Sequence, residues 1–388
     1  MLNENTLLRS YEYIKKYQCL DCLIYNSIDV RESKFKASPV DNNIFPAGFN
    51  NISKKSVEIF SQKLTEYFLQ NNIKTVVLVC EDHTRNIGYL HNVKILFDAI
   101  TKAGVKAEIT TLTLESHTVE LNDETFSFAE LELFECKTVG TKNIPKPDLI
   151  ILNNDLSGQQ AQECSKLKAM QNMKNVMPSA KMGWNNRKKS SHFIVYEELA
   201  KEVAQNVGFD HWFINAEFTT AQCMDFTSTQ ELTNLADAAS DLFKKIKAKY
   251  KEYKISQTPA VFLKSESGTY GLGVEKITHP EDLLNPNRTF RKKILYNKSK
   301  IANTEFLLQE AVPTAITQNG GTAECTIYTT FGESFGGFYR IHKQKNTMDN
   351  LNSKGAEFCP LEVEIAQRPS LLNFCAKLSS IAVSKEKF

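Results

Sequence analysis

The feature that most constrains the fold is a series of apolar segments of strand length that alternate with helical patterns. "KTVVLVCED" (74–82) and "AEITTLTL" (107–114) have the length and β-branched content of strands, and "HNVKILFDAITKAG" (91–104) between them has helical spacing and a closing glycine. A serine-capped helix at 53–71 precedes this β-α-β unit, and another apolar strand, 148–155, follows it. The pattern predicts an α/β fold with a parallel sheet covered by helices.

Polar side chains follow two of these predicted strands. In open parallel sheets, ligands bind in the crevice beyond the carboxyl ends of the strands. We therefore expect a ligand crevice to be lined by the following residues: Glu81, Asp82, His83, Thr84, Arg85, Asn86, Asn153, Asn154 and Asp155.

Composition excludes several classes of partner. The 388 residues are 41% hydrophobic and 24% charged, with a net charge of +2, so no global field favours nucleic acid or an anionic membrane. The first residues lack the pattern of an export signal, and no apolar run reaches the roughly 18 residues of a membrane span. We expect a cytoplasmic protein whose partners are small molecules, and the sequence leaves homo-oligomer formation open.

The nine cysteines are widely scattered and odd in number, which favours reduced thiols over a disulfide framework. Cys19 and Cys22 form a CxxC without a second CxxC or a histidine pair, so we interpret them as buried structural thiols rather than zinc ligands.

A change of pattern near residue 255 predicts a second region. Two further helices, 195–208 and 229–252, come first, and a β-loop-β-α-β order follows them. We divide the chain into an N-terminal α/β region, 1–254, and a second region, 255–388.

The glycine-rich stretch "KSESGTYGLGVEK" (264–276) opens this second region. In a P-loop the lysine follows the glycines and a helix comes next, whereas here the lysine precedes them and a strand follows. The order fits a hairpin whose amides fold over a triphosphate, with Lys264 as a point charge, although an ordinary glycine-rich hairpin has the same pattern. After the next helix, "FLLQEAVP" ends a strand at Gln309 and Glu310, which either face a nucleotide or simply precede a proline-stopped turn.

The stretch "TAECTIYTTFGESFGGFYRIH" alternates like a hairpin with its turn at Gly332. This pairing brings Glu324 and Arg340 to neighbouring strands. The loop "DNLNSKG" then offers Asn350 and Asn352, oxygen ligands of a kind that suits Mg²⁺, unless it is only an Asn-rich turn.

Two more polar clusters lie in the N-terminal half. Residues 27–51 start as a strand and continue as a long irregular segment with embedded aromatic residues, and such loops are often functional. "MGWNNRKKSSHF" (182–193) carries four basic side chains, which suit a carboxylate or a phosphoryl group better than nucleic acid. A solvated connection and a solvated basic turn are the alternatives. The polar residues of the two clusters include Arg31, Lys36, Asp41, Asn43, Asn50, Arg187 and His192.

Taken together, "SIDVRESKFKASPVDNNIFPAGFNN", "MGWNNRKKSSHF", "KSESGTYGLGV", "QEAVPT", "GGFYRIH" and "DNLNSKG" resemble, in order and spacing, the proteobacterial glutamate–cysteine ligase family, which has an ATP-grasp-like architecture. The similarity runs from about residue 25 to about residue 360. It implies that ATP drives the joining of the glutamate γ-carboxylate to cysteine through an acyl phosphate, the first step of glutathione synthesis.

The resemblance also implies roles for individual residues. Arg340 and Lys264 would act on the transferring phosphoryl group, and Glu324, Asn350 and Asn352 would hold Mg²⁺. The chain lacks the late strand pair with Glu-x-Asn that many ATP-grasp enzymes use for metal. The implied ATP-binding residues are Lys264, Ser267, Gly268, Thr269, Gly271, Gly273, Gln309 and Glu310. The implied substrate-binding residues are Arg31, Lys36, Asp41, Asn43, Asn50, Arg187 and His192. The resemblance thus implies that region 1–254 binds the substrates and that region 255–388 binds the nucleotide, with a lid at 255–313.

Two other functions stay open at this point. One is a different ligase of the same architecture, such as a glutathione-synthetase-like enzyme. The other is a non-catalytic sensor of amino acids or nucleotides on the same scaffold.

Overall fold

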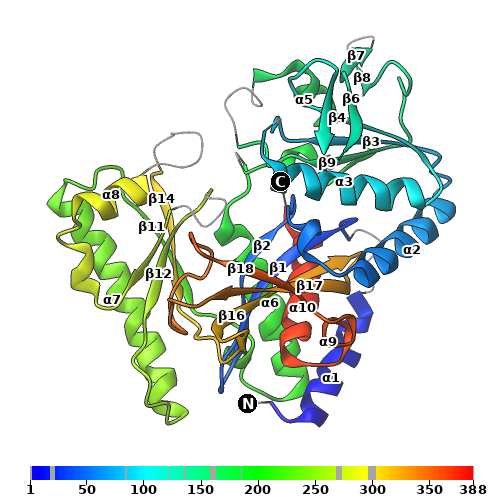
Figure 1. Ribbon diagram of the computed structural model, residues 1–388. Helices are drawn as coiled ribbons and strands as arrows, with labels where there is room; N and C mark the ends of the chain where they lie inside the picture. Colours follow the sequence, from blue (N-terminus) through cyan, green and yellow to red (C-terminus); the bar gives the residue numbers. More distant parts are fainter. Residues whose placement is uncertain are drawn as a thin grey trace.

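The computed structural model describes residues 2–17, 22–83, 85–121, 123–134, 137–157, 163–184, 186–267, 273–295 and 303–387. Within these ranges the chain forms two six-stranded sheets, a four-stranded sheet and a two-stranded ribbon, with helices packed on the larger sheets (Figure 1). The predicted α/β class is confirmed.

One six-stranded sheet is the predicted parallel sheet. Its order is β10-β9-β3-β4-β6-β5, and every pair is parallel except β5 with β6. Side chains of α2 and α3 pack on one face and those of α5 on the other. The elements are α2 (Lys54–Gln70), β3 (Thr75–Cys80), α3 (Ile87–Lys102), β4 (Lys106–Thr111), β5 (His117–Leu121), β6 (Glu124–Ala129), β9 (Leu149–Asn153), α5 (Ser165–Met170) and β10 (Val176–Met177).

Side-chain caps set where the two helices of this sheet begin. The Ser53 side chain accepts a hydrogen bond from the amide of Ser56 and starts α2, as predicted. Helix α3 begins at Ile87, earlier than the predicted 91–104, because the Asn86 side chain accepts a bond from the amide of Tyr89. The start of α3 consequently lies directly beyond β3.

The second six-stranded sheet joins the two ends of the chain. Its order is β18-β17-β16-β1-β2, with β15 on β16, and all its pairs are antiparallel. Helices α6 and α10 contact β2, and α10 also packs on β1 and β16 (Figure 1). The elements are α1 (Glu4–Ile14), β1 (Asn26–Glu32), β2 (Ala37–Asn43), α6 (Lys189–Val207), β15 (Thr317–Gln318), β16 (Gly321–Thr330), β17 (Glu333–His342), β18 (Glu357–Pro360) and α10 (Leu371–Lys385).

The strand pairs of this sheet differ from the predicted loop at 27–51 and from the predicted division of the chain at 254/255. Residues 27–51 are not a long irregular loop, because β1 and β2 form an antiparallel hairpin. The expected boundary at 254/255 does not separate the sheets, since β1 pairs with β16 from the other end of the chain.

The four-stranded sheet lies in the lobe at the left of Figure 1. Its order is β11-β14-β12-β13, again all antiparallel, and α7 packs on it. The helix expected between the second and third strands of this region was predicted to open at the proline of "HPEDLLNP" (279–286). These residues form only a short 3-10 turn, η5, and the α-helix, α8, begins at Arg288. The elements are β11 (Phe218–Gln222), α7 (Thr229–Glu252), β12 (Val261–Ser265), β13 (Val274–Ile277), η5 (Pro280–Leu283), α8 (Arg288–Leu295) and β14 (Glu305–Glu310).

Short elements complete the described chain. They are η1 (Lys15–Tyr17), η2 (Phe49–Asn51), β7 (Glu132–Phe134), β8 (Thr138–Gly140), η3 (Ala180–Met182), η4 (His211–Phe213) and α9 (Val363–Gln367).

No helix in the described ranges is both long enough and apolar enough to cross a membrane. The expected reduced thiols are found at Cys80, Cys164, Cys223, Cys325, Cys359 and Cys375. The expectation is wrong for Cys22, which is disulfide-bonded. Cys19 and Cys136 lie outside the described residues.

Phe49 packs where α2 meets the six-stranded antiparallel sheet. Its side chain is fully buried, and its ring centroid lies 5.3 Å from that of Tyr25, 5.4 Å from Phe60 and 5.2 Å from Tyr328. The cluster therefore joins the helices of the parallel sheet to the strands of the antiparallel one.

We predict that Phe49→Ala lowers the free energy of unfolding by about 3–5 kcal/mol, since it leaves a cavity among aromatic rings. Leu69→Ala is the control, because Leu69 is 74% exposed and its truncation should cost less than about 0.5 kcal/mol. Chemical denaturation of both variants measures the difference, and equal losses would contradict the role given to Phe49.

Candidate functional site

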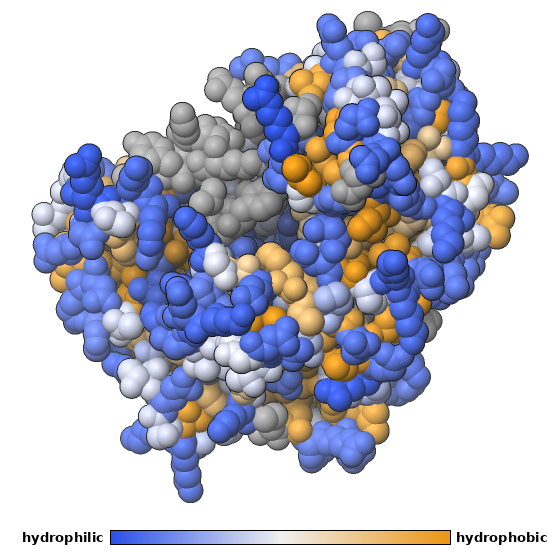
Figure 2. Space-filling model, in the orientation of Figure 1, coloured by the Kyte–Doolittle hydropathy of each residue, from blue (hydrophilic) through white to orange (hydrophobic). Residues whose placement is uncertain are grey.

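Two adjoining cavities lie where the three larger sheets meet. Cavity 1, about 60 Å³, has room for a few water molecules or a phosphoryl group, and cavity 2 is much larger, about 640 Å³. Asp29, Asp41, Arg340 and Asn352 line both cavities. Figure 2 shows a hollow near the middle of the molecular face, beside the lobe that carries β11–β14.

The wall of cavity 1 contains both basic and acidic side chains. Arg31, Lys189, Lys264 and Arg340 are each at most 7% exposed. The acidic residues of its wall are Asp29, Asp41 and Glu324. The excess of cations in a largely desolvated space favours an anionic ligand.

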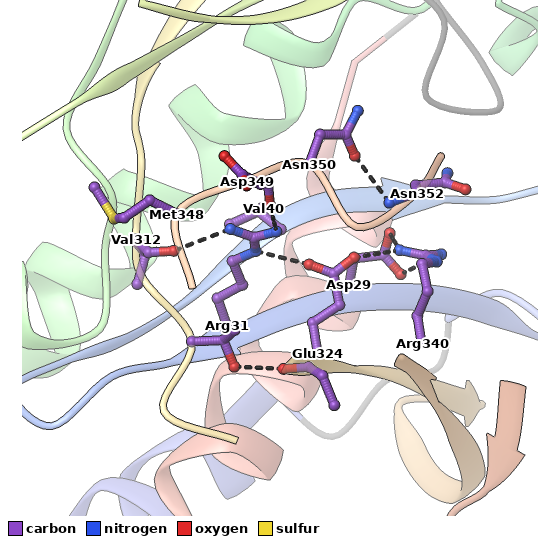
Figure 3. A network of polar contacts seen from close by, with 12 residues as sticks. Asp29, Arg31, Val40, Val312, Glu324, Arg340, Met348, Asp349, Asn350 and Asn352 are labelled. Carbon is purple, nitrogen blue, oxygen red and sulfur yellow. Dashed lines mark hydrogen bonds and ion pairs between the residues drawn. The ribbon is translucent and has the colours of Figure 1, made fainter. Parts of the chain in front are cut away.

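Glu324 occupies the centre of a charge network (Figure 3). Arg31 Nε donates to its Oε2 at 2.7 Å, and Arg340 Nη1 donates to its Oε1 at 2.6 Å and to Asp29 Oδ2 at 2.9 Å. The predicted hairpin produces this contact, because β16 and β17 place Glu324 opposite Arg340. Burial opposes ionisation of Glu324, but Arg31 and Arg340 hold its pKa below the usual value.

Arg31 also fixes two loops. Its Nη2 donates to the carbonyl of Asp349 at 2.6 Å and its Nη1 to the carbonyl of Val312 at 3.4 Å, as Figure 3 shows. Arg31 is therefore a candidate for holding the site together as well as for binding an anion.

Lys264, at the end of β12, is held by uncharged acceptors. Its Nζ donates to the carbonyl of Val40 and to Gln309 Oε1, both at 2.7 Å. Burial lowers the pKa of Lys264 to about 8; nearby Asp41 opposes this shift, whereas Lys189 and Arg31 add to it. An anion that enters cavity 1 would reduce the repulsion of Lys264 by Lys189 and Arg31.

Two charged residues that line cavity 1, Asp29 and Lys189, were not selected from the sequence. The apolar residues of its wall, Val40, Phe262, Val274 and Val312, were not selected either. Lys189 Nζ bonds to Asp41 Oδ1 at 2.9 Å and lies 4.6 Å from the centre of the Trp184 ring. Lys189 belongs to the basic cluster at 182–193, from which Arg187 and His192 were selected as candidates. Asp29 lies two residues before Arg31 on β1, on the same face of the strand.

Arg187 and His192 bind a protein carboxylate. Arg187 Nε and Nη2 each donate to Glu386 at 2.8 Å, and His192 Nδ1 lies 2.7 Å from Glu386 Oε1. Burial opposes ionisation of Glu386, but Arg187 and His192 hold its pKa at about 2. Neither basic residue lines cavity 1 or cavity 2, so this placement gives them a structural partner in place of the expected substrate.

Lys36 and Glu310 pair with each other in the interior. Lys36 Nζ lies 2.7 Å from Glu310 Oε2, both side chains are fully buried, and Trp212 Nε1 and the amide of Glu217 also donate to that oxygen. Neither residue lines cavity 1 or cavity 2. The placement therefore does not bring them to the predicted substrate or adenosine.

The predicted metal ligands do not form a cation site. Both carboxylate oxygens of Glu324 are bonded to guanidinium groups, and Asn350 Oδ1 accepts the amide of Asn352. No cluster of three or more His, Cys, Asp or Glu side chains suited to a metal occurs among the described residues. The donor set as folded does not fit Mg²⁺.

The remaining predicted residues are divided between the site and its surroundings. Asn43 and Asn50 line cavity 2, and the carbonyl of Gly273 accepts the amide of Ser265 where the glycine-rich hairpin rejoins β13. Ser267 is half-buried just beyond β12. Gly268, Thr269 and Gly271 lie outside the described residues.

Comparison with known proteins decides the family. A family model named "GshA: Glutamate-cysteine ligase" matches residues 4–377. The chain belongs to the glutamate-cysteine ligase family. A member of this family is a ligase, and its use of ATP follows from the family.

Solved structures agree with this family. The chain is similar to a crystal structure from Methylobacillus flagellatus KT whose name reads "Putative gamma-glutamylcysteine synthetase", with 27% identity, 98% of this chain and 93% of that chain covered, and a TM-score of 0.84. A glutathione synthetase-like effector from Globodera pallida matches at 9% identity, over 94% of this chain and 84% of that one, with a TM-score of 0.41, too low to carry an argument. A comparison with curated proteins finds no match.

For this ligase, we predict that Glu386→Ala lowers the free energy of unfolding by about 3–5 kcal/mol, since Arg187 and His192 stay buried without their partner. Arg187→Ala should cost less in the Glu386→Ala background than in the wild type. Denaturant titration of the double-mutant cycle measures this coupling. Strictly additive losses would show that Arg187 acts elsewhere.

Proposed function

We propose that this ligase joins the γ-carboxylate of L-glutamate to the amino group of L-cysteine at the expense of ATP, giving γ-glutamylcysteine, ADP and phosphate. The observation that carries the proposal is a buried, cation-rich cavity that shares four lining residues with a larger polar cavity. The first has the charge for a transferring phosphoryl group, and the second has the volume for amino-acid substrates.

The chemistry would proceed in two displacements. A γ-carboxylate oxygen of glutamate attacks the γ-phosphorus of ATP, and the bond from that phosphorus to ADP breaks, which gives an acyl phosphate. The cysteine amine then attacks the acyl carbon, the carbon–oxygen bond to phosphate breaks, and the amine loses a proton. Charge accumulates on phosphoryl oxygens in the first step, so fixed cations lower its barrier.

Lys264 and Arg340 are assigned to that charge, and Lys264 is also assigned to the phosphates that ATP shares with ADP. Among the described residues, the acceptors of Lys264 Nζ are both uncharged, and Arg340 Nε is buried without a hydrogen-bond partner in the same part of the chain. Both groups therefore keep capacity for an anion. Lys189, although paired with Asp41, adds a third positive charge to the same wall.

The nucleotide would lie against the β12–β13 hairpin in an ATP-grasp-like arrangement. Residues 267–273 are assigned to its phosphates and Gln309 to the nucleotide on β14; Gln309 Nε2 is buried and has no partner among the described residues. Mg²⁺ would arrive with the phosphates of ATP as part of the substrate, and no step here depends on a protein ligand to it.

A product assay tests the reaction itself. With ATP, Mg²⁺, L-glutamate and L-cysteine, we predict stoichiometric release of phosphate and formation of γ-glutamylcysteine. Omission of either amino acid should abolish both. Phosphate release that does not depend on cysteine would favour a different ligase of this architecture. No release with all substrates would favour the sensor.

The assignment of Lys264 predicts a pH dependence of nucleotide binding. Because its pKa is about 8, the side chain is charged below that pH, and affinity for ADP should fall as pH rises through 8. Loss of one hydrogen bond to a charged group corresponds to roughly tenfold to a hundredfold in affinity. Calorimetric titration with ADP between pH 6 and 10 measures it without interference from the cysteine thiol.

Two variants separate Lys264 from other groups. Lys264→Met should bind ADP weakly at every pH, and Lys264→Arg, which stays charged, should bind it with no loss up to pH 10. Wild-type affinity that is constant from pH 7 to 10 would contradict the assignment.

A further inference from the structure

Asn92 lines cavity 2 and, within the described residues, has an unused hydrogen-bond donor in its side chain. Its side chain is only 1% exposed and lines this cavity. Its Oδ1 accepts the amides of Gly48 at 2.8 Å and Phe49 at 2.9 Å, whereas its Nδ2 has no hydrogen-bond partner in the described structure. A buried donor without a partner costs stability, so its retention beside a large cavity points to a ligand that accepts its hydrogen bond.

The start of α3 borders the same cavity. Asn86, Gly88 and Tyr89 line cavity 2. The Asn86 side chain caps the amide of Tyr89, and the Asn86 carbonyl accepts the amide of Leu90, which leaves the first amides of this 16-residue helix without intrahelical acceptors. These amides and the helix dipole favour negative charge at this point.

The carboxylates that line cavity 2 are bonded to cations. His83, which pairs with Glu81, lines the cavity directly before α3. The acidic lining residues are Asp29 and Asp41, which are bonded to Arg340 and Lys189. The corner at α3 therefore presents amide donors, and the carboxylates of the cavity belong to the wall shared with cavity 1.

We propose that Asn92 Nδ2 and the first amides of α3 form a subsite for the α-carboxylate of an amino-acid substrate. The inference rests on the proposed function for the identity of that substrate. A carboxylate accepts several hydrogen bonds at once and so satisfies Nδ2 and the helix amides together. Its reacting end is left free to face Arg340, which lines both cavities.

Asn92→Asp tests the subsite with little change in shape. The aspartate keeps the oxygen that accepts the amides of Gly48 and Phe49 and replaces only Nδ2, so the fold should persist while a negative charge faces the carboxylate. We expect KM for L-glutamate or for L-cysteine to rise roughly tenfold or more, with KM for ATP and the melting temperature nearly unchanged. Whichever KM rises identifies the substrate, and a rise in neither overturns the proposal.

Asn234→Asp is the matched control. Asn234, exposed on α7, likewise accepts a hydrogen bond from Gln230 through Oδ1, so the same exchange adds the same charge away from cavity 2. Both KM values should equal those of the wild type in this variant. An equal rise in Asn234→Asp would attribute the effect to net charge and overturn the subsite.

A second variant serves if Asn92→Asp does not fold. Ile87 is the first residue of α3 and is 64% exposed, and proline is well accepted at this position while lacking the N–H. Ile87→Pro should raise the same KM relative to Ile87→Ala, which keeps the N–H. Equal KM values for the two variants would overturn the contribution of the helix.

Calorimetry separates the subsite from the reaction. If the wild type binds L-glutamate or L-cysteine and Asn92→Asp does not, the subsite stands even where the product assay fails. If the wild type makes γ-glutamylcysteine and Asn92→Asp has unchanged binding and KM, the subsite is wrong and the proposed function stands.

Discussion

The chain of charges from Arg31 through Glu324 and Arg340 to Asp29 is the interaction on which the site depends. It lies on three neighbouring strands, β1, β16 and β17, that come from opposite ends of the sequence. Each charge is largely buried, and a lone charge there would cost several kcal/mol, so no member is replaceable without loss. Pairing within the chain of charges therefore fixes the strand register and the walls of both cavities at once.

The cations of cavity 1 differ in how far their charge is neutralised by protein partners. A guanidinium already bonded to a carboxylate contributes less net field to a ligand than an ammonium held by neutral oxygens. Lys264 is of the second kind, because its acceptors are the carbonyl of Val40 and the amide of Gln309. Glu324 does not offer a free oxygen to a metal ion, because both of its carboxylate oxygens already accept hydrogen bonds from guanidinium groups.

Sequence patterns predicted the local elements better than the long-range pairs. Apolar periodicity located the parallel sheet and its helices, and the turn at Gly332 gave the Glu324–Arg340 pairing. The β1–β2 hairpin was missed because β2, "ASPVDNN", holds Pro39 and few strand-forming residues. As the edge strand, with a bulge at Val40 next to Pro39, β2 tolerates them. Nothing local marks Glu386 as the partner of Arg187, which lies 199 residues away, so a buried structural arginine resembled a substrate-binding one.

Arg340 lines both cavities, and its ion pairs do not use every hydrogen-bond donor of its guanidinium group. Its Nη1 is shared between Asp29 and Glu324, yet its Nε has no partner in the described structure. An anion that reached Nε would break neither ion pair, and the carboxylates around the guanidinium already offset its desolvation cost. Such a preorganised donor stabilises charge that develops during a reaction more effectively than a side chain that must first release its own partner.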